Sequence, residues 1–557
     1  QSRVKVHVQS DAGAMDRIPA YIRRTVQDPS TRDFTGQFWD APDSYEFRHP
    51  VPPLPASLRI YEAHVGMARE EGKVGSFAEF ARDVLPRIAS LGYNTIQLMA
   101  VMEHPYYGSF GYHVSSFFAV SSRFGTPEDL KALIDEAHRL GLRVLLDLVH
   151  SHAVRNTNEG LNLFDGTTHQ YFHAPPRGLH AAWDSMVFDY EKHEVLRFLL
   201  SNTRFWLEEY HFDGFRFDGI TSMLYLHHGL ERVFAGYDDY FGDQVDDDAL
   251  TYLKLANLLT HQLRPDAVTI AEDVSGMPGT ARPVAEGGLG FDYRLAMGVP
   301  DYWVKVVREK RDEDWQLGEL YGALLNRRRS EKHVAYAESH DQALVGDQTL
   351  AFRLIGPEMY WNMGKGSSTP VVERGIALLK LVRLLTFSLG GEAWLNFMGN
   401  EFGHPEWVDF PREGNHWSFK HARRQWSLGT RDDLRYHGLL LFDRALARLD
   451  EERLLLADPL IEQLALHEDT KQLVYRRGPL VFVFNFHPDR SYDGLRIPVP
   501  EARDYRPVLD TDAADFEGLG RTRSDVVFPL QKVPMYGREQ SIQLYLPQRS
   551  ALVLAPV

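Results

Sequence analysis

Ionisable side chains cluster at the ends of four short apolar segments of the chain. Carboxylate, imidazole and guanidinium groups are the ones that enzymes use for proton transfer, nucleophilic attack and charge stabilisation. If the four segments are strands of one parallel sheet, their ends meet at one edge and can form a single site. In chain order these side chains are Asp147, His150 and His152; Arg216 and Asp218; Glu272 and Asp273; and Glu338, His340 and Asp341.

The segment GFRFDGI, residues 214–220, pairs an arginine with a carboxylate. Strand alternation predicts that Arg216 and Asp218 share one face and that Phe215 and Phe217 share the other. A neighbouring guanidinium lowers the pKa of a carboxyl group and keeps it ionised, as a nucleophile requires. A structural buried ion pair explains this segment equally well when it is taken alone.

Glu272 follows the apolar run from Val268 to Ala271. Partial burial and a nearby ionised Asp218 would raise the pKa of Glu272, which suits a general acid. If the two carboxyl groups lie about 5 to 5.5 Å apart, the pair supports retaining cleavage of a glycosidic bond through a covalent intermediate. A single acidic residue at a strand end is more often solvated or caps a helix, so the hypothesis depends on the pair.

The histidines allow two interpretations. His150 and His152 could bind a metal with Asp147, but no further ligand cluster of familiar spacing accompanies them, so we expect no metal and no cofactor. His152 and His340 fit better as hydrogen-bond donors to sugar hydroxyls, and Asp341 can bind two hydroxyls and distort the ring. A lone histidine is usually structural, but both of these lie beside carboxylates.

Aromatic side chains supply the flat surfaces that cover the apolar faces of sugars. Tyr112, in the segment GSFGYH, is the predicted stacking residue, whereas Trp206 and Trp426 are expected in the core.

The elements that would position these residues follow a repeated strand and helix pattern. Short runs of β-branched and aromatic residues alternate with helical periodicity, which is typical of a parallel sheet, and eight such strands close a (β/α)8 barrel. The eight predicted strands are LRIYEAHVG from Leu58, YNTIQLMAV from Tyr93, LRVLLDLVH from Leu142, GFRFDGI from Gly214, AVTIAEDV from Ala267, FDYRLAMG from Phe291, HVAYAESHD from His333 and AWLNFMGNEFG from Ala393.

One intervening helix is predicted in detail. Thr126 is the expected N-cap, Pro127 suits the first helical position, and Gly141 stands where a left-handed residue would end the helix. The stretch from Ile376 to Met398 holds too many charges for a membrane span and is expected to be a core helix that runs into a strand.

Composition shifts predict three units. Residues 1–53, which end in a proline-rich linker, contain β-like pieces such as Val4 to Val8, and residues 54–455 carry the barrel. After about residue 450 the helices stop, so residues 456–557 are predicted to form an antiparallel β-sandwich. Its strands are expected at Leu473 to Tyr475, Leu480 to Phe486, Tyr505 to Leu509, Ile542 to Leu546 and Ala551 to Leu554.

Charge and composition exclude several classes of function. The 557 residues carry a formal net charge of −16, which disfavours nucleic acid as a partner. The sequence has no cysteine, which removes disulfides, thiolate nucleophiles and sulfur-ligated metals. No secretory signal is recognised at the start, so we expect a cytoplasmic protein that does not bind membranes.

Four motifs in order resemble the sequence regions of the α-amylase superfamily, and the chain is similar to its glycogen and starch branching enzymes. Two further stretches, GSFGYHVSSFFAVSSRFGTPEDL and MGNEFGHPEWVDFPREGNHWSF, resemble branching enzymes in particular. The four motifs are DLVHSH (147–152), GFRFDGITSM (214–223), TIAEDVSGMP (269–278) and AESHDQALVGD (337–347).

The resemblance implies an activity that cuts an α-1,4 link and transfers the chain to a 6-hydroxyl. It implies Asp218 as nucleophile, Glu272 as acid and base, and Asp341 as transition-state stabiliser. It also implies that the first fifty residues are the remnant of an N-terminal carbohydrate-binding module. His113 stands where the family would carry Gln. The implied subsite for the cleaved sugar consists of Tyr112, Asp147, His152, Arg216 and His340.

Two other functions fit parts of the pattern. A hydrolase of the same fold, such as an α-amylase or a debranching enzyme, would use the same carboxylates. A non-catalytic glycan-binding barrel is disfavoured because nucleophile, acid and stabiliser candidates are all present. We expect an α-1,4-glucan such as glycogen, amylose or amylopectin as the partner, and a monomer.

Overall fold

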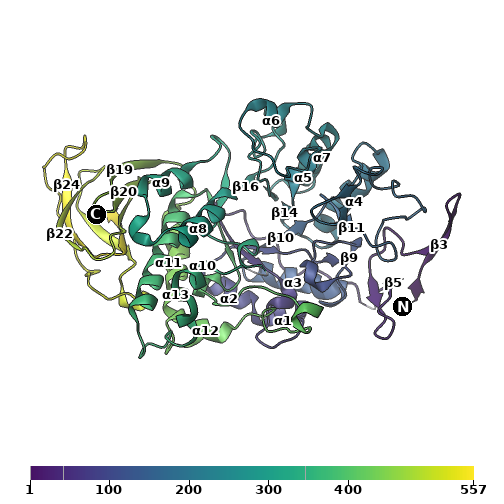
Figure 1. Cartoon of the computed structure of the whole chain (residues 1–557), viewed down its shortest axis with the longest axis horizontal. Helices are drawn as coiled ribbons and strands as arrows, with labels where there is room; N and C mark the ends of the chain where they lie inside the picture. Colours follow the sequence, from purple (N-terminus) through teal and green to yellow (C-terminus); the bar gives the residue numbers. More distant parts are fainter. Residues whose placement is uncertain (1, 42, 345–346) are drawn as a thin grey trace.

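The computed structural model describes residues 2–41, 43–344 and 347–557. Val345 and Gly346, which belong to the fourth motif, lie outside the described residues. Figure 1 shows three regions along the longest axis: purple N-terminal strands at one end, the barrel with its helices in the middle, and the yellow C-terminal strands at the other end.

The centre of the molecule is a closed barrel of eight parallel strands, so the predicted fold class is confirmed. The strands are adjacent in chain order around the barrel, and each hydrogen bonds to the next. All eight coincide with predicted segments. They are β6 (Leu58–Ala63), β7 (Thr95–Leu98), β10 (Arg143–Leu148), β14 (Gly214–Phe217), β15 (Val268–Ala271), β16 (Tyr293–Leu295), β17 (His333–Ala335) and β18 (Ala393–Phe397).

Side-chain alternation divides the barrel strands between two cores. Ile60, Ile270 and Leu395 belong to a small cluster inside the barrel, whereas Phe215 and Phe217 belong to the large cluster between barrel and helices. The outward position of the two phenylalanines leaves Arg216 on the inner face, as the strand pattern predicts.

Helices cover the outside of the barrel. The helix α3 follows the sequence prediction closely: Thr126 and Asp129 form a reciprocal capping box, Pro127 is the first residue, and Gly141 has a φ of +78°. The helices are α1 (Phe77–Asp83), α2 (Leu85–Ser90), α3 (Pro127–Arg139), α4 (His193–Glu209), α5 (Ile220–Leu224), α6 (Tyr237–Phe241), α7 (Asp247–Leu263), α8 (Gly298–Glu309), α9 (Leu317–Leu325), α10 (Leu350–Ile355), α11 (Pro370–Leu389), α12 (Trp426–Thr430) and α13 (Tyr436–Arg453).

The predicted core helix that runs into a strand corresponds to α11 followed by β18. Most of the second half of α11 is buried, and Lys380 and Arg383 on it are paired inside the protein rather than exposed. None of the helices in the described ranges combines the length and apolar character needed to cross a bilayer. Trp206 is buried and Trp426 is partly buried against the same core.

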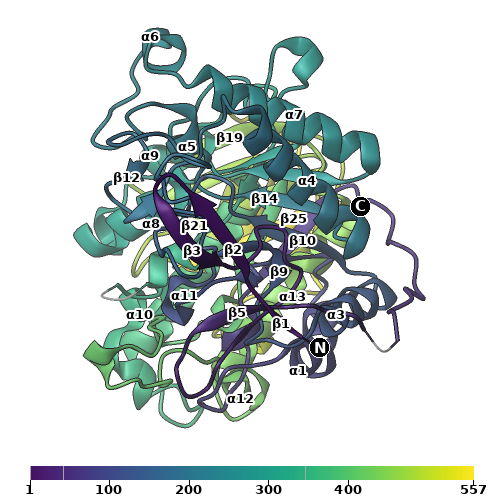
Figure 2. The same ribbon diagram turned by 90° about the vertical axis from the view of Figure 1, so that its right-hand side faces the viewer.

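Short strands precede the barrel and branch from it. Val4 to Val8, predicted as one β piece, is divided between β1 and β2, and β2 forms a hairpin with β3 that projects in front of the barrel in Figure 2. The strands outside the barrel and the C-terminal region are β1 (Arg3–Val4), β2 (Val6–Ser10), β3 (Gly13–Arg17), β4 (Thr25–Gln27), β5 (Phe34–Gln37), β8 (Met102–Glu103), β9 (Ser116–Val120), β11 (Ala153–Val154), β12 (Leu179–His180) and β13 (Ser185–Met186).

The C-terminal region forms an antiparallel sheet in the order β19-β20-β21-β25-β23, covered by the pair β22-β24. Val481 and Val483 of the sheet and Ile542 of the pair share one buried cluster, which gives the two-layer arrangement. The strands β19 and β22 have no counterpart in the sequence prediction. The seven strands are β19 (Ile461–His467), β20 (Gln472–Arg477), β21 (Leu480–Asn485), β22 (Tyr492–Pro498), β23 (Tyr505–Asp510), β24 (Ser541–Leu546) and β25 (Ser550–Pro556).

Candidate active site

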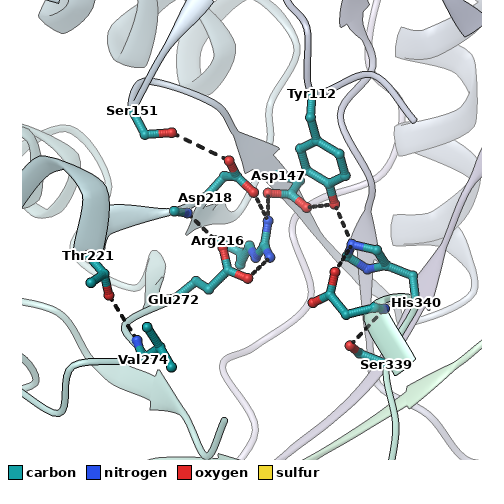
Figure 3. A network of polar contacts seen from close by, with 12 residues as sticks. Tyr112, Asp147, Ser151, Arg216, Asp218, Thr221, Glu272, Val274, Ser339 and His340 are labelled. Atoms are coloured by element: carbon teal, nitrogen blue, oxygen red, sulfur yellow. Dashed lines mark hydrogen bonds and ion pairs between the residues drawn. The ribbon is translucent and has the colours of Figure 1, made fainter. Parts of the chain in front are cut away.

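The guanidinium of Arg216 joins three predicted site carboxylates at the carboxyl end of the barrel (Figure 3). Its Nη1 lies 2.6 Å from Asp147 Oδ1 and 2.7 Å from Asp218 Oδ1, and its Nη2 lies 2.6 Å from Glu272 Oε1. Asp147 is directly opposite Arg216 in the β10–β14 register, and Glu272 directly follows β15. Three adjacent strands therefore bring these groups together.

Asp218 and Glu272 bind the two terminal nitrogens of one planar fork. Both carboxylates retain about 12 % side-chain exposure, so a substrate can reach them, whereas Arg216 is buried beneath them. Because the two carboxylates bind neighbouring nitrogens of one guanidinium, they lie close together. This arrangement favours the carboxylate separation of about 5 to 5.5 Å that retaining glycosidases use over the longer separation in inverting enzymes.

The surroundings of Glu272 favour its protonated form. Burial raises its pKa to about 8; the carboxylates of Asp218 and Asp341 add to this rise, whereas Arg216 opposes it. The main-chain N–H of Gly219 donates to Glu272 Oε2 at 2.6 Å and fixes the orientation of the carboxyl group. A carboxyl group that holds a proton near neutral pH can act as a general acid.

Asp147 lies beneath the cavity rather than on its wall. It is fully buried, and burial raises its pKa, although the guanidinium of Arg216 and the hydroxyl of Tyr112 oppose the rise. The Tyr112 hydroxyl donates to Asp147 Oδ2 at 2.8 Å, and the Tyr112 ring stacks on His340 with centroids 5.5 Å apart. Tyr112 is therefore fixed by a hydrogen bond at its hydroxyl and by stacking of its ring.

Glu62 is a site residue that the sequence reasoning missed. Its Oε1 lies 2.8 Å from His340 Nδ1, and its Oε2 accepts the main-chain N–H of His340 at 3.1 Å. Burial lowers the pKa of His340, but the carboxylates of Asp341 and Glu62 overcome this and raise it to about 10. His340 is therefore a cation at neutral pH, with its Nε2 lying 3.2 Å from both Tyr112 Oη and Asp341 Oδ1.

The histidines of the first motif have different surroundings. His152 Nε2 lies 2.9 Å from the carbonyl oxygen of Tyr112, so a sugar hydroxyl would have to share or replace this hydrogen bond. His150 bonds to Tyr252 and Asn202, deep below the site. Burial lowers the pKa of each histidine to about 4, so both rings are neutral.

Two other predicted strand-end residues serve the scaffold. Asp273 pairs with Arg294 at 2.6 Å, and Glu338 accepts the main-chain N–H of Leu350 at the start of α10. Within the described ranges, no three His, Asp or Glu side chains are grouped as a metal site would need. The expectation of a site without metal or cofactor stays a prediction.

A cavity of about 270 Å³ opens above these groups. Seven of the eight predicted residues line it, with Asp147 below; their roles in catalysis and binding stay predictions. The sequence reasoning assigned no role to several other lining residues, because they sit in loops without periodicity. The lining residues are Ser109, Phe110, Tyr112, His113, His152, Trp183, Arg216, Asp218, Gly219, Glu272, His340, Asp341 and Leu344.

Comparison with known protein families gives two matches. Residues 81–178 match the alpha amylase catalytic domain, and residues 465–557 match the alpha amylase C-terminal all-beta domain. The fold is also similar to an alpha-amylase from Geobacillus thermoleovorans complexed with acarbose (TM-score 0.62, 17% identity, 90% of this chain and 98% of that one). An Anoxybacillus alpha-amylase gives a TM-score of 0.63 at 16% identity, with 90% of this chain and 98% of that chain covered.

Similarity over almost the whole of this chain extends to curated proteins named 1,4-alpha-glucan-branching enzyme. The protein from Solanum tuberosum is 56% identical over 94% of this chain, which spans 62% of that relative's length. The protein from Yarrowia lipolytica is 54% identical and that from Equus caballus 53%, each over 100% of this chain and over 83% and 80% of the relative. The predicted family resemblance is confirmed, and the chain belongs to the 1,4-alpha-glucan-branching enzyme family.

Proposed function

We propose that this protein is a 1,4-α-glucan branching enzyme that works by retaining double displacement. The main support is that Asp218 and Glu272 bind the two terminal nitrogens of Arg216 and face one cavity. The membership of the chain in this family supports the same conclusion. The first carboxylate is the proposed nucleophile, and the second is the proposed acid and base.

In the first proposed step, Glu272 donates its proton to the oxygen of an α-1,4 link while an Asp218 oxygen attacks the anomeric carbon. The bond to the leaving chain breaks, and a glycosyl ester on Asp218 forms. The raised pKa of Glu272 supports this role because the group holds its proton at neutral pH. Arg216 keeps Asp218 oriented throughout.

In the second proposed step, Glu272 removes the proton from the 6-hydroxyl of another glucosyl unit, and that oxygen displaces Asp218. The product is an α-1,6 branch, and both carboxyl groups return to their starting states. A positioned hydroxyl can act with an effective molarity on the order of 10⁵ M or more, which exceeds the concentration of bulk water. Transfer therefore outruns hydrolysis only if the acceptor is well held.

The remaining site residues have proposed binding roles. The His340 cation and the Asp341 carboxylate stand at one side of the cavity, where they can bind hydroxyls of the cleaved sugar. The Asp341 carboxylate can also stabilise positive charge at the anomeric carbon. Tyr112 offers its ring, while Asp147 and His152 support the same subsite from below and from one side.

The proposal extends to the organisation of the protein. We propose residues 1–53 as the remnant of a carbohydrate-binding module with its linker, residues 54–455 as the catalytic unit, and residues 456–557 as the C-terminal β-unit. The proposed substrate is glycogen, amylose or amylopectin, and the protein is proposed to act as a cytoplasmic monomer. The absence of cysteine is compatible with a reducing compartment.

The test is product analysis with amylose. A branching enzyme lowers iodine staining and creates α-1,6 links, which proton NMR detects, with little gain in reducing ends. Glu272→Gln serves as the control that removes turnover. Reducing ends that rise in step with bond cleavage would instead support the alternative, a hydrolase of the same fold. Glucan binding without any turnover would support the non-catalytic alternative.

A further inference from the structure

Trp183 is the one tryptophan among the described residues that line the cavity. It lies in the turn between β12 and β13, and β13 pairs with β11, which begins immediately after His152. The residue is 36 % exposed. The small sheet β11-β13-β12 therefore places an indole ring at the same opening as the catalytic carboxylates.

One face of this indole is already covered. The His180 ring stacks on Trp183 with centroids 4.0 Å apart and planes 9° apart, and His180 is fully buried. Neither ring nitrogen of His180 has a hydrogen-bond partner within the described part of the chain. Burial lowers the pKa of His180 to about 4, so the ring is neutral. His180 thus contributes an apolar stack that holds the indole flat.

The indole lies at the border between the acid and base and the cleaved-sugar subsite, because its ring also packs against His152 with centroids 4.9 Å apart. A Cβ placed on Gly219 would be only 2.9 Å from Trp183 Cη2, and the Gly219 N–H donates to Glu272 Oε2. In Figure 3, Ser151 and Glu272 lie on one side of Arg216, whereas Tyr112 and His340 lie on the other. Trp183 belongs to the Gly219 and Ser151 side.

The position of Trp183 indicates which glucosyl unit the indole contacts. Glu272 exchanges its proton with the oxygen that links the cleaved sugar to its neighbour, so that neighbour lies beyond Glu272, on the side away from Tyr112 and His340. We propose that Trp183, braced by His180, forms a binding site for the glucosyl unit that carries this oxygen: first the end of the leaving chain, and then the acceptor that brings the 6-hydroxyl. The inference rests on the proposed branching reaction.

Loss of the Trp183 ring should affect hydrolysis and transfer differently, which loss of a purely structural residue would not do. A glucosyl acceptor needs the indole as a platform, but water does not, so losing the ring should change the ratio of hydrolysis to transfer. Total cleavage falls as well, because the leaving chain uses the same site. The ratio is independent of the fraction of folded enzyme, since both products come from the same intermediate.

The experiment uses the full chain with amylose and counts new reducing ends and new α-1,6 links. Trp183→Leu is expected to raise the ratio of hydrolysis to transfer about threefold to tenfold, the range for one aromatic stacking contact. Trp183→Phe, which keeps a ring, should stay within about twofold of the unmodified protein. Trp361→Leu makes the same change at a tryptophan that is 80 % exposed and outside the cavity, and should leave the ratio unchanged.

A second pair of variants tests the stacking of His180 on Trp183 and remains informative if Trp183→Leu fails to fold. His180→Ala removes the stacked ring and should raise the ratio, whereas His180→Phe restores the stack and should restore the ratio. The proposal is overturned if Trp183→Leu lowers both products in equal proportion, or if His180→Ala leaves the ratio unchanged. Absence of α-1,6 links from the unmodified protein would be a different failure, that of the proposed function itself.

Discussion

Replacing Glu62 by Gln tests how the site keeps His340 charged. Glu62 is 2 % exposed, and its two oxygens receive three donors: His340 Nδ1, the His340 main-chain N–H, and Gln97 Nε2 at 3.2 Å. Gln has the same shape, but it removes the negative charge and directs an NH₂ group at a donor. The variant therefore loses a buried charge-assisted hydrogen bond and leaves one donor without an acceptor.

The size of the effect follows from the pKa of His340. Burial disfavours the cation, yet Asp341 and Glu62 raise the pKa to about 10 from an ordinary value of 6.5. That difference corresponds to about 5 kcal/mol between the two protonation states. Because the pKa is higher in the folded protein, this stabilisation is complete below pH 6.5 and is lost as the pH rises through 10. Removing one of the two carboxylates should therefore lower the free energy of unfolding by about 2 to 3 kcal/mol.

Urea-induced unfolding from pH 6 to pH 10 measures this cost. The unmodified protein should exceed Glu62→Gln in free energy of unfolding by about 2 to 3 kcal/mol at pH 6, and the gap should narrow toward pH 10 as His340 loses its proton. Glu194→Gln is the matched control, because Glu194 is an exposed partner of Arg197. A gap that stays constant across this range would refute the assigned coupling between Glu62 and His340.

Three further predictions concern catalysis, and a fourth concerns stability. Asp218→Ala should abolish measurable branching, and Glu272→Gln should lower kcat about 10²- to 10⁴-fold, while circular dichroism shows a retained fold for both. Near-normal activity in either variant would contradict its role. Activity should fall above about pH 8, where Glu272 loses its proton, and a rate profile that is flat to pH 10 would exclude it as the acid. Arg216→Lys should lower kcat on the order of 10²-fold, because an ammonium cannot replace the planar fork; steady-state kinetics check this. Gly219→Ala should cost about 1 to 2 kcal/mol in unfolding free energy, because φ is +59° and the new Cβ would contact Trp183.

The barrel and most site residues were predictable for a physical reason. Strands that are covered on both faces require continuous runs of apolar residues, so each barrel strand stands out in the sequence. A charged group that ends such a run must lie at the rim or be paired, which identified Arg216, Asp218 and Glu272. The alternation of the two phenylalanines with Arg216 then predicted the face on which the ions meet.

Residues that depend on long-range packing were not predictable in the same way. Glu62 lies inside the segment LRIYEAHVG, where one acidic residue in an apolar run did carry a signal, since a buried carboxylate needs a partner. The partner, His340, is distant in sequence. Trp183 lies in a loop with no periodicity, and only the last two of the seven residues of β22 are buried, so neither gives a strong pattern.

In the proposed mechanism, the charges around Arg216 would let Glu272 serve as acid and then as base. The Asp218 carboxylate beside Glu272 helps Glu272 to keep its proton, because a second negative charge there would be repelled. In the proposed ester intermediate on Asp218 that charge is gone, so the pKa of Glu272 should fall. Its proton has just left with the leaving chain, and the lowered pKa keeps the carboxylate ionised until an acceptor hydroxyl arrives. Displacement of the ester restores the charge on Asp218 and, with it, the higher pKa that returns the proton to Glu272.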